Sequence, residues 1–164
     1  MKVLITGASG SVGSGSAERL ASKYDLSLSD VGEMDTSAPY FRADIRVDGA
    51  LDLAAAGADV IVHTPAYHGI HMGTFSEKEF YDLNVTGKFN MFQSALRNKV
   101  RRVVWLSSMS VYGNDFYAYT KKIGEQLCQY YHDKHGLEVI MLRPSDFTPY
   151  KDFRHYGESC CMAA

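Results

Sequence analysis

The stretch Thr6-Gly7-Ala8-Ser9-Gly10-Ser11-Val12-Gly13 decides the fold, because it joins an apolar run to a helix-like one. Val3-Leu4-Ile5 before it is typical of a buried strand, and Ala17-Glu18-Arg19-Leu20 after it belongs to a helix. The glycines are spaced G-x-x-G-x-x-G, which allows a tight turn, close approach of the backbone to a pyrophosphate, and close packing of helix on strand. The first N–H groups of the helix would then hold the anion.

A flexible glycine-rich turn is the alternative interpretation of this stretch. Its position between a first strand and a first helix favours a dinucleotide site instead. We expect cofactor contacts from Gly7, Ser9, Gly10, Ser11, Val12 and Gly13.

An acidic residue follows the second predicted strand. Leu26-Ser27-Leu28-Ser29 alternates with period two, and Asp30 comes directly after it. A carboxylate at this place accepts hydrogen bonds from the adenosine ribose hydroxyls and repels a 2′-phosphate. No arginine follows closely in the sequence, so we expect NAD rather than NADP. The alternative is an ordinary solvated loop aspartate.

Short apolar runs alternate with longer helix-like stretches along the rest of the chain. The expected strands are residues 3–5, 26–29, 40–43, 59–63, 103–106 and 137–142. The expected later helices are residues 51–56, 77–98 and 117–135, the last ended by Gly136. This alternation predicts an α/β fold, a doubly wound parallel sheet with helices on both faces in a Rossmann-like three-layer arrangement. The default strand order is 3-2-1-4-5-6.

The composition suits a single folded domain. We expect an NAD(P)-binding domain over residues 1–149 and a short C-terminal tail over residues 150–164. With 46% hydrophobic residues the chain can build a core, and a formal net charge of −2 argues against nucleic-acid binding. No apolar run approaches the roughly 20 residues of a membrane helix, and the N-terminus makes a poor signal peptide. We therefore expect a soluble, cytoplasmic protein.

The histidines and cysteines give little support to a metal centre. Three cysteines without a C-x-x-C spacing argue against structural zinc and against a disulfide framework. His68-Gly69-Ile70-His71 is the segment that most invites a metal hypothesis, but no third ligand lies nearby in the sequence. A substrate-facing loop is favoured there, because loops beyond the carboxyl ends of parallel strands bind ligands. We expect no metal, and we expect Cys128 to be a small buried hydrophobe.

Several short motifs, in order, resemble the short-chain dehydrogenase/reductase family, in particular its extended branch of NAD-dependent epimerases, dehydratases and related dehydrogenases. The segments that carry the resemblance are Thr6–Gly13, Asp44-Ile45, His63–Ala66, Asn84–Gly87, Leu106–Gly113, Tyr117-x-x-x-Lys121 and Leu142-Arg143-Pro144. Besides the glycine loop and Asp30, the resemblance implies cofactor contacts from Asp44, Ile45, Thr64, Pro65, Ala66, Asn84, Ser107, Tyr117, Lys121 and Pro144. It also implies a homodimer through the helices 77–98 and 117–135, with Phe89, Phe92, Tyr130 and Tyr131 as candidate contacts.

The same resemblance places a catalytic site at Ser108, Tyr117 and Lys121. Residues four apart share one face of a helix, so Lys121 can lie beside Tyr117. A tyrosine with a pKa of about 10 is a poor base, but a nearby ammonium lowers that pKa. Tyr117 can then remove a hydroxyl proton while Ser108 orients the oxygen. Tyr119 lacks a lysine four residues later, so we expect it only to pack beside this turn.

Two features differ from the usual pattern of this family. Ser108 and Tyr117 are nine residues apart, whereas extended members carry a longer loop there. About twenty residues follow Pro144, where extended members continue into a substrate domain, so the resemblance implies that most of that domain is missing.

Three hypotheses remain open at this point. The chain is an NAD-dependent oxidoreductase, epimerase or dehydratase acting on a sugar or nucleotide sugar. Alternatively, it is a catalytically silent NAD-binding sensor or scaffold, or a truncated fragment of such an enzyme. Release of NADH during turnover would separate a dehydrogenase from an epimerase.

Overall fold

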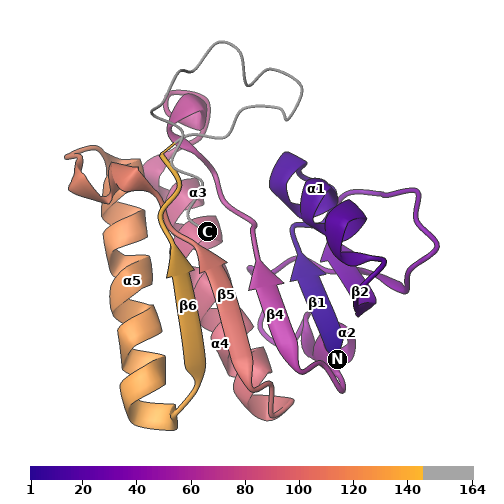
Figure 1. The fold of residues 1–164 in the computed structure, drawn as a ribbon. Coiled ribbons are helices and arrows are strands. Elements are labelled where there is room, and N and C mark those ends of the chain that lie inside the picture. Colours follow the sequence, from indigo (N-terminus) through magenta and orange to yellow (C-terminus); the bar gives the residue numbers. More distant parts are fainter. Residues whose placement is uncertain (146–164) are drawn as a thin grey trace.

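A six-stranded parallel sheet runs through residues 1–145, which are the residues that the computed structural model describes (Figure 1). In chain order its strands are β1 (Lys2–Thr6), β2 (Asp25–Asp30), β3 (Tyr40–Arg42), β4 (Val60–His63), β5 (Arg102–Leu106) and β6 (Glu138–Leu142). They lie in the order β3-β2-β1-β4-β5-β6, and every neighbouring pair is parallel. The predicted doubly wound α/β fold and its strand order are confirmed. The predicted tail, residues 150–164, and the boundary before it lie outside the described residues.

The central strands are buried on both faces, which explains their continuous apolar character. Leu4, Ile5 and Ile61 are completely buried, and β1 pairs with β4 so that Leu4 lies opposite Ile61. A parallel sheet needs cover on both sides, because its crossover connections carry helices across the faces.

The helices cover the two faces unequally. They are α1 (Ser11–Leu20), α2 (Asp52–Ala55), α3 (Glu77–Tyr81), α4 (Gly87–Arg97) and α5 (Phe116–His135), with short 3₁₀ turns η1 (Gly69–His71) and η3 (Met109–Tyr112). The helices α2, α4 and α5 pack on one face, where the rings of Phe92 and Tyr131 stack 4.3 Å apart. On the opposite face α1 packs Ala17 against apolar residues of β1 and β2.

The outer strand β6 keeps much of its surface exposed. Ile140 and Leu142 are 43% and 40% exposed, and the β5–β6 register places Ile140 beside Val104. Val104 belongs to the core cluster on the α1 side of the sheet. That face is therefore open at its β6 end in the described part of the chain.

The helix predicted over residues 77–98 contains an irregular turn. It begins as α3, passes through the π-helical turn η2 (Asp82–Thr86) and continues as α4. Asn84, inside η2, makes its side-chain hydrogen bonds to Tyr67 and Thr120, outside its own helix. A π turn inserts one extra residue and is frequent at functional sites.

The long helix α5 begins and ends as its sequence predicts. The Asp115 carboxylate accepts a hydrogen bond from the Ala118 backbone N–H at 2.7 Å. Gly136 ends the helix in the left-handed conformation, with φ of +67°. Among residues 1–145, no helix has the length and apolar character needed to cross a membrane.

Candidate active site

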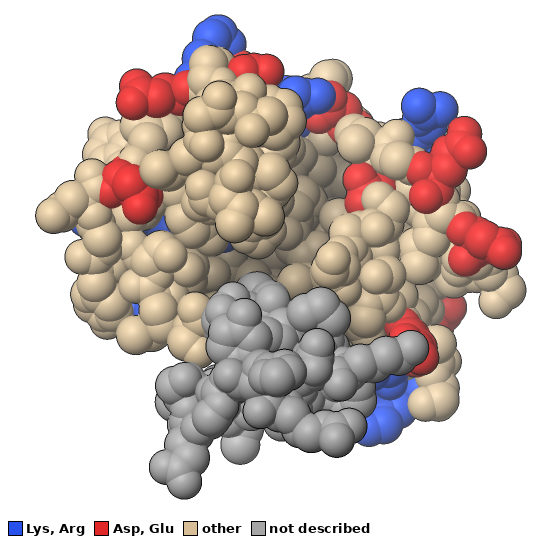
Figure 2. Space-filling view, turned by 90° about the horizontal axis from the view of Figure 1, so that it is seen from above, with Lys and Arg blue, Asp and Glu red and all other residues tan. Residues whose placement is uncertain are grey.

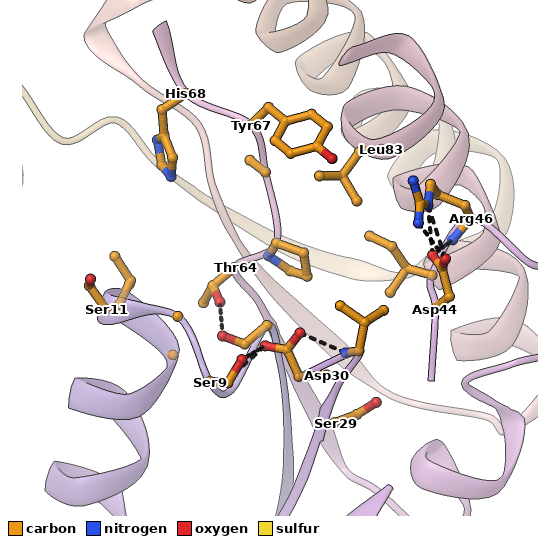
Figure 3. Close-up of a pocket in the computed structure, with 18 of the residues that line it drawn as sticks. Ser9, Ser11, Ser29, Asp30, Asp44, Arg46, Thr64, Tyr67, His68 and Leu83 are labelled. Carbon is orange, nitrogen blue, oxygen red and sulfur yellow. Dashed lines mark hydrogen bonds and ion pairs between the residues drawn. The ribbon is translucent and has the colours of Figure 1, made fainter. Parts of the chain in front are cut away.

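A cleft of about 540 Å³ opens at the carboxyl ends of β1, β2 and β4. Figure 2 looks down on this end of the sheet and shows the surface hollowed near its centre, with charged residues around the rim. The lining residues come from loops that are far apart in the sequence (Figure 3). They include all six predicted residues of the glycine loop, together with Asp30, Asp44, Ile45, Thr64, Pro65 and Ala66.

The glycine loop has no room for side chains at two of its positions. Gly7 has φ of +71°, and a Cβ there would lie 2.6 Å from the Thr64 Oγ1 atom. A Cβ on Gly13 would lie 2.8 Å from the Ala8 Cα atom, so the first turn of α1 packs directly on the loop. The helix N-terminus at Ser11 borders the cleft, where the first N–H groups of a helix and its dipole favour an anion.

Asp30 is held in place by the glycine loop. One carboxylate oxygen accepts hydrogen bonds from the Ser9 N–H at 2.9 Å and from the Ser9 hydroxyl at 2.7 Å. The other oxygen accepts from the Val31 N–H at 2.7 Å. The sequence did not suggest that Arg42 lies near Asp30. Its Nε atom donates to the carbonyl oxygen of Val31, the residue after Asp30, at 3.1 Å. Arg42 is twelve residues after Asp30, and only the pairing of β2 with β3 brings it there.

The far end of the cleft is formed by Asp44, Ile45 and Arg46. Arg46 binds both carboxylate oxygens of Asp44, at 2.7 to 3.0 Å. These hydrogen bonds lower the pKa of Asp44, so its carboxylate is ionised at neutral pH. Sequence reasoning missed Arg46, although an arginine two residues after an aspartate offers a pairing signal.

Beside the cleft, the end of β4 carries a histidine that is fully buried. His63 forms a 2.8 Å hydrogen bond with the Thr6 hydroxyl, and burial lowers its pKa far below the ordinary value, so it is neutral. The next residue, Thr64, donates its hydroxyl to the Thr6 carbonyl oxygen at 2.8 Å. These contacts fix the Thr64–Ala66 segment against β1.

The short connection between Ser108 and Tyr117, nine positions apart, brings the three candidate catalytic residues together. Ser108 is 8% exposed, Tyr117 6% and Lys121 4%. The Lys121 Nζ atom lies 5.5 Å from the centre of the Tyr117 ring and donates to the Leu106 carbonyl oxygen at 2.9 Å. Burial raises the pKa of Tyr117 above its ordinary value, and its side-chain hydrogen bond with Ser108 offsets only part of this rise, so the expected lowering of this pKa by Lys121 is not found. Burial lowers the pKa of Lys121 to about 8.

The three residues lie just beyond the His68 end of the cleft. His68 lines the cleft, and its ring centre is 6.1 Å from that of Tyr117. His71 also lines this end, so the loop after β4 does face the cleft, as its sequence suggested.

Besides Tyr117 and Lys121, three further predicted cofactor residues lie outside the cleft lining and have other contacts. The Asn84 side chain bonds both backbone groups of Tyr67 and the Thr120 hydroxyl. The Ser107 hydroxyl donates to Glu125 at 2.6 Å, and the Pro144 carbonyl oxygen accepts from the Met109 N–H at 3.0 Å. None of the three is among the described residues that line the cleft. Their contact with a cofactor stays a prediction.

A second buried lysine was not anticipated from the sequence. Lys88 of α4 is 2% exposed, and its Nζ atom lies 2.9 Å from the centre of the Trp105 ring. Burial lowers the pKa of Lys88 well below its ordinary value. Lys121 lies 5.2 Å from the same ring. Within residues 1–145, no group of three or more histidine, cysteine, aspartate or glutamate side chains is placed to hold a metal ion.

Comparisons with known proteins agree on one family. The model of the NAD dependent epimerase/dehydratase family matches residues 3–158. The L-arabinose 1-dehydrogenase (NAD(P)(+)) of Haloferax volcanii is 28% identical over 87% of this chain and 65% of its own length. A uronate dehydrogenase of Pseudomonas syringae is 27% identical over 90% of this chain and 60% of its own length. The chain thus spans less than two thirds of these relatives.

Solved structures agree on the fold as well. A uronate dehydrogenase from Agrobacterium tumefaciens has a TM-score of 0.77 at 26% identity, over 90% of this chain and 62% of that one. The dTDP-glucose 4,6-dehydratase DesIV from Streptomyces venezuelae, a double mutant solved with NAD bound, has a TM-score of 0.80 at 26% identity. The match covers 92% of this chain and 57% of the DesIV chain.

Proposed function

Because the chain belongs to the NAD-dependent epimerase/dehydratase family, we propose that it binds NAD and oxidises a hydroxyl of a sugar or nucleotide sugar. The observation that carries the proposal is the juxtaposition of Ser108, Tyr117 and Lys121 at the His68 end of the cleft. A simple dehydrogenase releases NADH, whereas an epimerase or dehydratase returns the hydride within one cycle. The proposed function includes both kinds of reaction.

Residues along the cleft suit the successive parts of a dinucleotide. A Cβ at Gly7 or Gly13 would collide with neighbouring atoms, so these glycines let the loop pack closely on β4 and α1, and a pyrophosphate would lie at the N-terminus of α1. Asp30 would hold the adenosine ribose, and Asp44 with Ile45 would border the adenine. Thr64, Pro65 and Ala66 would flank the nicotinamide half. When bound there, the nicotinamide supplies the hydride acceptor.

Tyr117 would act as the general base of the oxidation. The phenolate form of Tyr117, stabilised by the Lys121 ammonium, would take the proton of the substrate hydroxyl and become the neutral phenol. Ser108, bonded to Tyr117, would hold the substrate oxygen and stabilise the charge that develops on it. Because both Tyr117 and Lys121 are buried, their interaction is weakly screened by water.

We also propose a homodimer through α4 and α5. Phe89 and Tyr130 are 44% and 54% exposed on these helices, whereas Phe92 and Tyr131 are in the core. Only Phe89 and Tyr130 can therefore contact a second subunit. Sedimentation equilibrium should give twice the chain mass for the wild type and one chain mass for Phe89→Glu. Leu53→Glu, at a 73% exposed site on α2, should stay dimeric. A monomeric wild type would contradict the dimer.

The first test of function is a titration of the purified chain with NAD and with NADP, followed by a screen of sugars for NADH formation. Micromolar binding that favours NAD, with NADH formed from at least one sugar, supports the proposal. Tight NAD binding without conversion of any sugar or nucleotide sugar supports the silent sensor or scaffold instead. Failure of the folded chain to bind either cofactor contradicts both.

A further inference from the structure

The end of β6 runs beside the segment that carries Ser108. Strands β5 and β6 are neighbours in the sheet (Figure 1), and their backbone pairing continues past the end of β5. The Ser107 N–H donates to the Leu142 carbonyl oxygen at 2.7 Å, and the Met109 N–H donates to the Pro144 carbonyl oxygen at 3.0 Å. The backbone on each side of Ser108 is therefore bonded to β6 or to the residues just after it.

The Arg143 side chain adds a second connection, to α5. Its Nε and Nη2 atoms donate to the two carboxylate oxygens of Glu125, each at 2.7 Å. The same carboxylate accepts a hydrogen bond from the Ser107 hydroxyl at 2.6 Å. A guanidinium fork matches a carboxylate in one planar arrangement, so this pair fixes the direction of the Glu125 carboxylate as well as its distance. The hydrogen bonds from Arg143 lower the pKa of Glu125, so its carboxylate is ionised at neutral pH.

Arg143 also binds the turn η3, which Ser108 caps. Its Nη1 atom donates to the hydroxyl of Tyr112, the last residue of η3, at 3.1 Å. At the start of the turn, the Ser108 hydroxyl accepts a hydrogen bond from the Ser110 N–H at 3.0 Å. One guanidinium thus joins α5, the end of β6 and the turn that begins at Ser108.

Glu125 lies on the same face of α5 as two of the candidate catalytic residues. Tyr117, Lys121 and Glu125 are spaced four residues apart, so they follow one another along this face. The bond between Glu125 and Ser107 therefore determines how α5 lies against the end of β5. It also determines the distance between the side chains of Tyr117 and Ser108, which are carried by these two elements.

The exposure of the Arg143–Glu125 pair argues against a role in stability alone. The Arg143 side chain is 43% exposed and that of Glu125 is 17% exposed, and ion pairs open to solvent contribute little to stability. A second pair offers a direct comparison. The Arg102 Nε atom donates to Glu138 at 2.7 Å and joins the same two strands at their amino ends, opposite the end at Ser108.

We propose that Arg143 and Glu125 are positioning residues, which hold the Ser108 hydroxyl at the distance from Tyr117 that the oxidation needs. Neither residue lines the cofactor cleft, so both act through Ser107 and η3. A misplacement of about 1 Å can cost on the order of a hundredfold in rate. This inference rests on the proposed function, because it assigns two further residues to the same reaction.

Matched variants at the two ion pairs test this role. NADH formation is measured with L-arabinose, D-glucuronate and any other sugar that the wild type converts. Arg143→Ala should lower kcat by about tenfold to a hundredfold and change KM and NAD affinity by less than about twofold. Glu125→Gln keeps an acceptor for Ser107 but loses the charged fork, so it should lower kcat by a smaller factor. It provides the test if Arg143→Ala does not fold. Arg102→Ala should keep the wild-type kcat.

A double variant separates positioning from a general loss of structure. If Arg143 acts through Ser108, Arg143→Ala should cost nothing further in a Ser108→Ala background, so the two losses are not additive. Additive losses would overturn the inference, and so would equal losses of kcat in Arg143→Ala and Arg102→Ala.

Amide hydrogen exchange gives a measurement that does not depend on turnover. The Met109 and Ser110 N–H groups are bonded to Pro144 and to the Ser108 hydroxyl. Both should exchange about tenfold faster in Arg143→Ala than in the wild type, and at the wild-type rate in Arg102→Ala. If the wild type converts no sugar, the proposed function fails, but faster exchange still supports the hold of Arg143 on this turn. Unchanged exchange overturns the inference in either case.

Discussion

At the scale of single residues, the phenol of Tyr117 is subject to opposing effects. Burial raises its pKa, the side-chain hydrogen bond with Ser108 offsets only part of that rise, and the Lys121 Nζ atom lies 5.5 Å from the centre of its ring. The resemblance of the sequence to the short-chain dehydrogenase/reductase family predicted these three residues. It did not predict Lys88, because the neighbours of Lys88 come from other segments, and it missed Arg46, although its partner Asp44 is only two residues away.

Tyr117→Phe tests the phenol directly. The variant keeps the ring but removes the proton acceptor, so kcat should fall by about 10²- to 10⁴-fold while the protein still binds NAD. Tyr119→Phe, two residues away at a 53% exposed site, should keep wild-type activity. Initial rates and cofactor titrations measure both. Equal rates for Tyr117→Phe and the wild type would remove Tyr117 from the chemistry.

Asp30→Ala tests the choice of cofactor. The change removes the carboxylate that would face the ribose and leaves Arg42 at the same corner. The ratio of NADP to NAD affinity should therefore rise by about tenfold, or ~1.4 kcal/mol, since a repulsive charge is lost. Calorimetric titration with the two cofactors measures the ratio. An unchanged ratio would show that Asp30 does not face the ribose.

At the scale of elements, the sequence predicted the strands more accurately than the helix between residues 77 and 98. Its apolar spacing indicates one continuous helix, and one extra residue in a π turn barely disturbs that spacing. The turn becomes visible only through the bonds of Asn84 to Tyr67 and Thr120. Sequence periodicity carries no information on such contacts.

Gly124→Ala tests the packing of α5 on the sheet. A Cβ at this position would lie 2.7 Å from a ring carbon of Trp105 and would also meet the buried Lys88 Nζ atom. We expect a loss of about 1–3 kcal/mol in the free energy of unfolding. Gly15→Ala in α1 is the matched control, because nothing lies within 4 Å of its added Cβ. Gly15→Ala should raise the free energy of unfolding by about 0.5–1 kcal/mol. Urea unfolding measures both, and equal effects would contradict this packing.

At the scale of the whole molecule, buried lysines make stability depend on pH. The pKa of Lys121 falls from 10.5 to about 8 because burial disfavours the ammonium, and burial also lowers that of Lys88. Above pH 8 the unfolded chain binds more protons at these residues than the folded chain, so stability rises with pH. Burial raises the pKa of Cys128 from 9.0 to about 12, which opposes the rise above pH 9.

We therefore expect the free energy of unfolding to increase between pH 8 and 9. Lys121→Met should reduce this increase, because the titrating amine is gone while its apolar stem is kept. Lys134→Met, at an exposed site on the same helix, should leave it unchanged. Urea unfolding at half-unit pH steps provides the slopes. Identical slopes for the wild type and Lys121→Met would mean that Lys121 is solvated.

Trp105 gives the protein a built-in optical reporter. It is the only tryptophan in the chain and is 2% exposed. The Lys88 Nζ atom lies over its ring, and the Lys121 Nζ atom lies 5.2 Å from the ring centre. Indole emission overlaps the absorption band of reduced nicotinamide, so NADH held near Tyr117 would quench it by energy transfer. The emission maximum would also shift as Lys88 and Lys121 change protonation. The intrinsic fluorescence of Trp105 can therefore report both the binding of NADH and the protonation of Lys88 and Lys121.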